Sequence, residues 1–337
     1  MAKQTVTRRQ KDVSRMIRDH KGLRKDRIEK KDVLTHAKGM TMGRKRPEEG
    51  DDGLFTPADR RQMAAEGLTI RRIKNQLEMF RTGVPYIRLN RPCRIGDGID
   101  VIPTDRHAAI LAFYEEAARQ GRCLKFVPAS GAASRMFVDW YRAMDAGCMG
   151  RAQEEADFAR DLEKYPFIGD LREALAGSGL APERLLAEKR HSEILSYILT
   201  SRGLGYGQKP KALIKFHAYP SGNRTAIEEH LVEAALYVKD ADRISRLHVT
   251  VSAEHRSLVR ECLRRVQADY ARRYDCAFRI GISIQKPSTD TIAVDPENRP
   301  FRRDDGSLYF RPGGHGALLE NLNALDSDIV FLKNIDN

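Results

Sequence analysis

The 337-residue sequence has few cysteines, a single tryptophan and no long apolar run. Its five cysteines are scattered and form no CxxC pair, which argues against a disulfide framework and against a zinc site. No segment approaches the roughly 18–20 consecutive apolar residues that a membrane span requires. The N-terminus also lacks the apolar core of a signal peptide. These absences predict a cytoplasmic protein that does not engage a membrane.

Positive charge is concentrated near the N-terminus. The net charge is +12, and the first 50 residues hold 16 Lys and Arg against seven Asp and Glu. This stretch has few aliphatic and no aromatic residues, so we expect residues 1–53 to form a disordered basic tail. A basic tail can bind nucleic acid through counterion release, but a solvated extension explains the same composition, and we favour the extension. Residues 54–337 are expected to form the folded domain.

Helix signals dominate the first part of this domain. Helices are predicted from Thr56-Pro57 to Gly67, from Thr69 to Arg81, from Thr104 or Asp105 to Gly121, and through a helical insert at about 150–203. The third of these helices is expected to bury an apolar face that includes Ala109, Leu111 and Phe113.

The second part alternates strands with helices. Strands are expected at 123–127, 212–216, 247–252, 277–285, 308–310 and 328–334, and helices at 225–238, 254–274 and 317–325. Thr225 and Glu228 have the spacing of a capping box at the start of the first of these helices. The repeated strand-then-helix order predicts an α/β fold with a mostly parallel sheet covered by helices.

The segment FVPASGAASRMF, from Phe126 to Phe137, predicts a strand, a loop of small residues and a helix. The loop has small side chains at Ser130, Gly131, Ala132 and Ser134, which would let a phosphate approach the backbone. Backbone N–H groups and the positive end of a helix dipole bind phosphate in such loops, and Arg135 adds a positive charge. A plain strand-to-helix turn that needs small residues for packing is the alternative, and the loop alone does not decide between them.

Other polar residues follow apolar runs, where ligands bind in parallel sheets. They are Lys211 and Lys215 as cations, Gln285, Gly314 and His315 on loops, and Asp336 as a carboxylate suited to Mg²⁺. A loop that can hold an anion, two lysine cations and a carboxylate together indicate a nucleotide-phosphate site. A solvated edge explains the lysines equally well and a frayed end explains Asp336, and these alternatives stay open.

Six long motifs carry a resemblance to a known family. They are FVPASGAASRMF, PKALIKFHAY, RTAIEEHL, QKPSTDTIA, RPGGHGAL and FLKNIDN. In this order they are similar to the motifs of an uncharacterised bacterial family, domain of unknown function 4301, over residues 54–337. That family implies no established activity.

A more distant resemblance links the same motifs to sugar-nucleotide pyrophosphorylases, which have a GT-A-like nucleotidyltransferase fold. ASGAASRM is similar to their signature A-G-G-x-G-T-R-M, with Ser130 and Ala133 in place of glycines. PKALIKF with RTAIEEHL resembles their P-K-P-L segment and the K-P-L-I-E-H-L segment that follows it. RPGGHGAL is similar to the P-x-G-H-G loop, and FLKNIDN resembles the strand that ends in Asp-Asn.

The resemblance implies a role for each matching position. Backbone groups around Gly131 and Arg135 would hold the triphosphate, Lys211 would contact phosphate, Gly314 and His315 would lie near base or sugar, and Asp336 would bind Mg²⁺. The implied reaction is attack of a sugar 1-phosphate on the α-phosphate of a nucleoside triphosphate, with release of pyrophosphate. Pyrophosphorylases carry a second metal-binding Asp on a later strand, so a copy shortened after Asn337 that binds nucleotide without catalysis is the alternative.

Replacing Arg135 by Ala is the first test of this hypothesis. A charge-assisted contact to phosphate is worth about 1.5–3 kcal/mol, so the variant should bind nucleoside triphosphate at least about tenfold more weakly. Calorimetric titration of wild type and variant with the same nucleotide measures the difference. An unchanged affinity would remove Arg135 from the site.

Overall fold

The computed structural model describes residues 53–131 and 133–337. Residues 1–52 of the predicted basic tail and Ala132 therefore lie outside the described residues. Internal contacts divide the chain into two units, 1–56 and 57–337, and the fold below is that of the second unit. Among the described residues, no helix is both long enough and apolar enough to cross a membrane.

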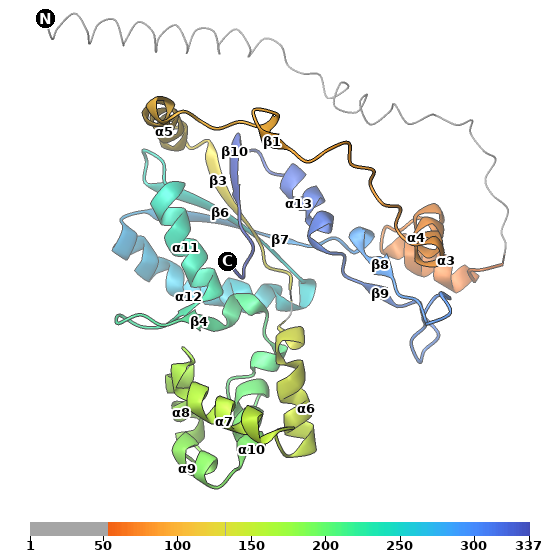
Figure 1. The fold of residues 1–337 in the computed structure, drawn as a ribbon, viewed down its shortest axis with the longest axis vertical. Helices are drawn as coiled ribbons and strands as arrows, with labels where there is room; N and C mark the ends of the chain where they lie inside the picture. Colours follow the sequence, from red (N-terminus) through yellow and green to blue (C-terminus); the bar gives the residue numbers. More distant parts are fainter. Residues whose placement is uncertain (1–52, 132) are drawn as a thin grey trace, which may run out of the picture. The chain divides into compact units, whose positions relative to one another are not determined.

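The second unit is built on a sheet of four parallel strands (Figure 1). In spatial order these are β10 (Ile329–Leu332), β3 (Cys123–Pro128), β6 (Ile244–Val251) and β7 (Ala277–Ile284). All four overlap segments expected to be strands, although β6 begins three residues earlier than predicted and β3 ends one residue later. The predicted α/β class with a parallel sheet covered by helices is confirmed.

Helices cover the two faces of this sheet. The helices α11 (Ala226–Tyr237) and α12 (Arg256–Tyr274) share one apolar core with the strand residues Val127, Leu247 and Val249. The short helix α13 (Leu319–Asn323) lies against the opposite face, where the Asn321 side chain donates to Ser283 Oγ at 2.8 Å. Side chains of a strand alternate between its faces, so Ser283 points away from the α11 and α12 layer.

The order of the strands defines where the connections change direction. From β3 the chain passes to β6 and then to β7, and it later returns across the sheet to β10 on the other side of β3. Parallel crossovers are right-handed, so a reversal of direction requires the connecting helix to change face. This accounts for α13 on the face opposite α11 and α12. The reversal places a topological switch point between β3 and β10.

A helical insert separates β3 from β6, as predicted. Its helices are α6 (Val138–Ala146), α7 (Ala152–Asp161), α8 (Ile168–Ala176), α9 (Pro182–Ala187) and α10 (His191–Leu199), with 3₁₀ turns η1 (Ser134–Phe137), η2 (Leu162–Lys164), η3 (Tyr206–Gln208) and η4 (Lys211–Leu213). The insert has its own core, in which Leu171, Leu195 and Ile198 are fully buried. Figure 1 shows it below the edge where β3 and β10 end.

Two expected strands lie outside the main sheet. The segment predicted at 212–216 begins with η4, and only β4 (Lys215–His217) follows, paired antiparallel with β5 (Arg224–Thr225). The segment predicted at 308–310 contributes β9 (Phe310–Arg311), which pairs with β8 (Thr291–Ile292). Apolar runs of this length indicate extended chain but not the partner strand, which tertiary contacts decide.

The first two helices, α3 (Pro57–Ala65) and α4 (Ile70–Thr82), lie where the sequence predicts them. Thr69 Oγ1 accepts from the Arg72 N–H and caps α4. Arg302 donates to both carboxylate oxygens of the buried Asp59 at 2.8 and 2.9 Å, which joins α3 to the segment between β8 and β9.

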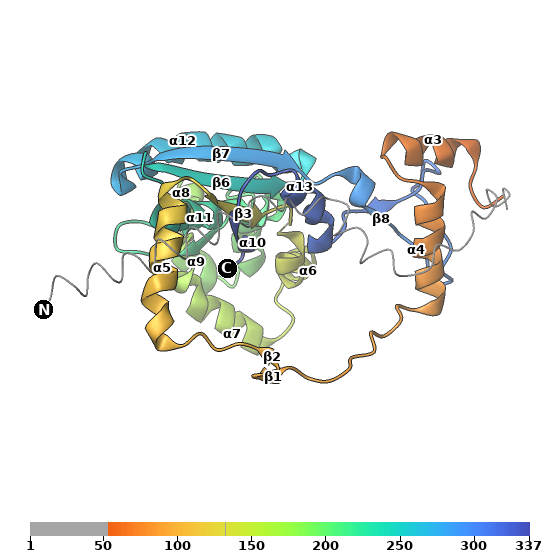
Figure 2. The same cartoon turned by 90° about the horizontal axis from the view of Figure 1, so that it is seen from above.

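An extended segment, 83–103, leads from α4 to α5 (Thr104–Arg119), and Figures 1 and 2 show it running apart from the sheet. It contains the two-residue strands β1 (Arg94–Ile95) and β2 (Gly98–Ile99). The predicted apolar face of α5 is wrong, because Ala109, Leu111 and Phe113 are exposed. The buried residues of α5 are instead Ala117 and Ala118, near its C-terminal end.

The capping box of α11 provides a stability test. Glu228 accepts hydrogen bonds from the N–H and the hydroxyl of Thr225, both at 2.7 Å. Thr225→Ala removes the hydroxyl and should lower the free energy of unfolding by about 1 kcal/mol. Thr225→Ser keeps the hydroxyl and should lose much less. Urea unfolding followed by circular dichroism measures both, and equal losses would show that the methyl group, not the cap, matters.

Candidate functional site

The loop after β3 uses its small residues for two purposes. Ala129 and Ala133 are fully buried, so these two positions serve packing. Gly131 is exposed, and a Cβ at this position would meet no atom within 4 Å. Packing therefore does not require the glycine, and its open backbone is available to a ligand. The loop leads directly into η1, which holds Ser134 and Arg135, and then into α6.

A buried glutamine connects this loop to the loop after β9. Ser130 Oγ donates to Gln285 Oε1 at 2.8 Å, and Gln285 Nε2 donates to the Gly313 carbonyl at 2.9 Å. Only 8% of Gln285 is exposed. A Cβ on Gly313 would lie 2.6 Å from the Thr289 carbonyl oxygen, so only glycine fits there. The adjoining Gly314 is exposed and precedes η7 (His315–Leu318). The structure thus brings Ser130, Gln285 and Gly314 to one edge.

Lys211 and Asp336 meet beside the same loop. Lys211 Nζ lies 2.9 Å from Asp336 Oδ2, and the Lys211 N–H donates to the Gly131 carbonyl at 3.4 Å. The Ile335 N–H donates to the Pro128 carbonyl, which aligns the end of β10 with the end of β3. The predicted cation, the predicted metal ligand and the small-residue loop therefore converge at the switch point, although 125 positions separate the two ionised residues.

Lys215 has a different neighbour. Its ammonium lies 2.7 Å from the carboxylate of Asp170 on α8. This ion pair joins β4 to the helical insert. Lys215 is accordingly directed toward the insert, whereas Lys211 is directed toward Asp336.

A partly buried charge cluster, not anticipated from the sequence, fixes the segment that carries Asp336. The Glu233 carboxylate on α11 accepts from Lys125 of β3 and from Lys333 just after β10. Lys125 is fully buried and also donates to the Tyr237 hydroxyl at 2.6 Å. Burial opposes the charge of Glu233, but the hydrogen bonds from Lys125 and Lys333 outweigh it and lower its pKa to about 2. One carboxylate thereby holds two neighbouring strands.

His230, one turn before Glu233, contacts the same segment. Its Nε2 lies 3.4 Å from the Ile335 carbonyl oxygen, and its Nδ1 is buried without a hydrogen-bond partner. Burial, with a smaller effect of the nearby Lys125, lowers the pKa of His230 to about 4. The imidazole is therefore neutral at physiological pH. In the sequence, His230 and Glu233 stand three positions apart, and this spacing places them on one helix face.

The arrangement offers a cation, a half-exposed carboxylate and free loop backbone at one edge. Asp336 is 49% exposed, and its second carboxylate oxygen has no partner among the described residues. Within 53–131 and 133–337, no group of three or more His, Cys, Asp or Glu side chains is placed to hold a metal ion. Chemically, the edge can accept an anion against Lys211 and a cation against Asp336.

The model of the family described as Domain of unknown function (DUF4301) matches residues 56–337. The chain belongs to this family. No curated protein matches the sequence significantly.

One similar solved structure is the uridine diphosphate N-acetylglucosamine pyrophosphorylase from Trypanosoma brucei in complex with inhibitor. The two chains are 13% identical, the match covers 84% of this chain and 47% of that one, and the TM-score is 0.42. This chain thus spans about half the length of that protein. At this TM-score the likeness carries no argument about function.

The buried imidazole predicts how stability depends on pH. Unfolded His230 binds a proton near its ordinary pKa of 6.5, whereas the folded chain binds it only near 4. Between these values the unfolded state holds more protons, so the free energy of unfolding should fall as the pH drops from 6.5 to 4, by at most about 3 kcal/mol. His230→Gln should flatten this dependence in urea titrations at successive pH values. The exposed-site control His107→Gln should keep the wild-type slope, and a wild-type slope in both would contradict the assignment.

Proposed function

We propose that the chain binds a nucleoside triphosphate with Mg²⁺ at the edge between β3 and β10 and transfers its nucleotidyl group to a sugar 1-phosphate. The observation that supports this most is the Lys211–Asp336 pair beside Gly131. In open parallel sheets, ligands bind outside the carboxyl ends of the strands at a topological switch point, where this pair lies. Its two charges complement a phosphate group and a divalent cation.

The chemistry of nucleotidyl transfer suits such a site. In-line attack at a phosphate needs positioned reactants and neutralised charge, and it requires no activated serine or cysteine. Lys211 would offset charge on the phosphates, and the exposed backbone at Ser130 and Gly131 would position them. The Ser130–Gln285–Gly313 connection would place the loop after β9 beside the same ligand. Base or sugar would then lie near Gly314 and His315.

Asp336 fits the role of a magnesium ligand of modest intrinsic affinity. Mg²⁺ in nucleotide sites is held by one or two carboxylates, substrate phosphates and water, and does not need a cage of protein ligands. A half-exposed carboxylate with one unpaired oxygen satisfies this. The ion would polarise the phosphate and neutralise its charge. Lys211 would hold the carboxylate in place before the ligands arrive.

Paired variants test the proposal. Lys211→Met should weaken Mg²⁺-nucleotide binding about tenfold or more, because a charge-assisted contact is lost. Asp336→Asn should instead remove most of the dependence of nucleotide affinity on Mg²⁺. Calorimetric titration with a panel of nucleoside triphosphates, with and without Mg²⁺, measures both. The matched control Lys164→Met, at an exposed lysine of the insert, should bind like the wild type.

Pyrophosphate release separates the transferase from a protein that only binds nucleotide. With the best-bound triphosphate and a panel of sugar 1-phosphates, the proposed enzyme releases pyrophosphate, and both site variants release less. Tight Mg²⁺-dependent binding without turnover would support the non-catalytic alternative. Mg²⁺-independent affinity in the wild type would contradict the role of Asp336.

A further inference from the structure

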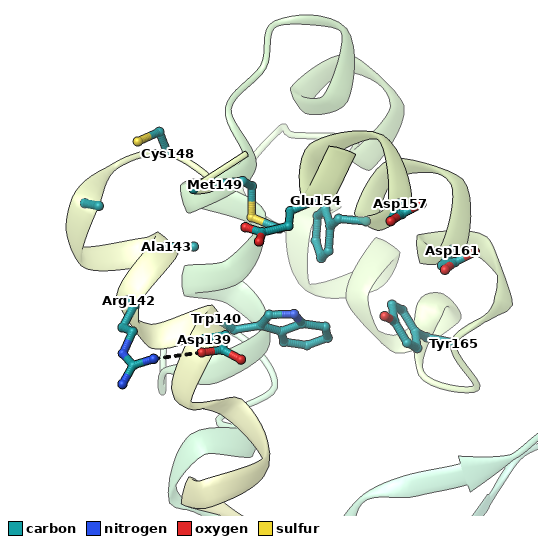
Figure 3. Close-up of a pocket in the computed structure, with 13 residues that line it drawn as sticks. Asp139, Trp140, Arg142, Ala143, Cys148, Met149, Glu154, Asp157, Asp161 and Tyr165 are labelled. Carbon is teal, nitrogen blue, oxygen red and sulfur yellow. Dashed lines mark hydrogen bonds and ion pairs between the residues drawn. The ribbon is translucent and has the colours of Figure 1, made fainter. Parts of the chain in front are cut away.

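A cavity lies in the helical insert, between α6 and α7, with a volume of about 530 Å³ (Figure 3). None of its lining residues belongs to the edge formed by Gly131, Lys211 and Asp336. The volume falls in the range of small-molecule sites, which is about 300–1,000 Å³. The cavity is therefore large enough for a small organic ligand, and its lining indicates which kind.

Aromatic rings form much of the wall. Phe137 stacks on Trp140 at 5.4 Å between ring centroids, and Phe158 and Tyr165 each meet Trp140 at 5.7 Å and at interplanar angles of 86° and 77°. Trp140, Phe158 and Tyr165 all line the cavity. Trp140 is the sole tryptophan of the chain, and its indole is only half buried. Faces of such rings carry negative potential and attract cations, and tryptophan attracts them most strongly.

The charges of the lining are mainly negative. Asp139 of α6 and Glu154, Asp157 and Asp161 of α7 contribute carboxylates, against Arg142 as the single lining cation. Most of these carboxylates are already paired with a side chain close by in the sequence. The pairs are Asp139 with Arg142 at 3.0 Å, Asp157 with Arg160 at 2.5 Å, and Asp161 with Arg160 and Lys164 at 3.0 and 2.6 Å.

Glu154 is the exception. Its only charged partner among the described residues is Arg151, 3.6 Å away, and the Arg151 side chain is 83% exposed. That distance is too long for a hydrogen bond. Figure 3 shows the Glu154 carboxylate turned toward the cavity, beside Met149 and across from Trp140. An anionic group thus faces an aromatic wall.

We propose that this cavity binds an organic quaternary ammonium ion between Trp140 and Glu154. A quaternary ammonium has no N–H group, so it needs aromatic faces and one counter-charge but no further hydrogen-bond acceptors. The lining supplies both, as the rings of Trp140, Phe158 and Tyr165 and the carboxylate of Glu154. An anion would be repelled by the lining carboxylates. The proposal is independent of the nucleotide site.

Choline is the probe, and 3,3-dimethylbutan-1-ol is its control, because the two have the same shape and differ in charge. Saturation-transfer NMR on the full-length protein measures binding of each probe, and the emission of Trp140 locates it in the cavity. Choline should bind saturably and at least about threefold more tightly than the neutral alcohol, and should change the emission of Trp140. No saturable choline binding, or equal affinity for both compounds, overturns the proposal.

Glu154→Gln and Asp145→Asn form a matched pair of variants. Each removes one carboxylate from an exposed position, but Asp145 on α6 does not line the cavity. Glu154→Gln should weaken choline binding at least about threefold and leave the alcohol unaffected, while Asp145→Asn should bind both like the wild type. Circular dichroism verifies that the variants fold. Equal choline affinity in wild type and Glu154→Gln overturns the proposal.

Discussion

The reversal of chain direction at β3 is the constraint on which the rest of the unit depends. Because β6 and β10 both pair with β3, the loops that follow β3 and β10 must leave the sheet side by side. The handedness of parallel crossovers then distributes the helices over both faces. Lys211 reaches Asp336 only because the chain returns from the insert at this same edge. The topology of the sheet, more than any single side chain, thus determines where the candidate site lies.

Stability and site geometry are coupled through Glu233. Lys125 is fully buried, so removing its partner Glu233 is costly, because the remaining charge lacks water and a counter-ion. Glu233 engages Lys125 of β3 and Lys333 after β10, so ion pairs as well as main-chain hydrogen bonds hold the strand ends beside Asp336. His230 adds an uncharged polar contact to the same segment at neutral pH.

The strands of the main sheet and the small-residue loop after β3 could be predicted from local sequence patterns. The run before Pro128 reads as a strand, the residues after it are small, and the Thr225–Glu228 spacing indicates a capped helix; all three are observed. Lys125 could not be predicted to be buried, because its partner lies on a helix 108 positions away. The face of α5 was also unpredictable, since apolar residues such as Leu111 do not reveal what covers them. Whether Lys215 faces the site depends on how the insert packs.

The Lys211 N–H donates a hydrogen bond to the Gly131 carbonyl where the chain leaves the sheet for the insert and returns from it. The two bonded residues flank the insert. The points where the chain leaves the sheet and returns to it therefore lie next to each other. The insert has a core of its own, centred on residues such as Leu171 and Leu195. Segments with adjacent ends and an independent core are exchangeable units, which can be lengthened, replaced or excised while the parallel strands keep their pairing.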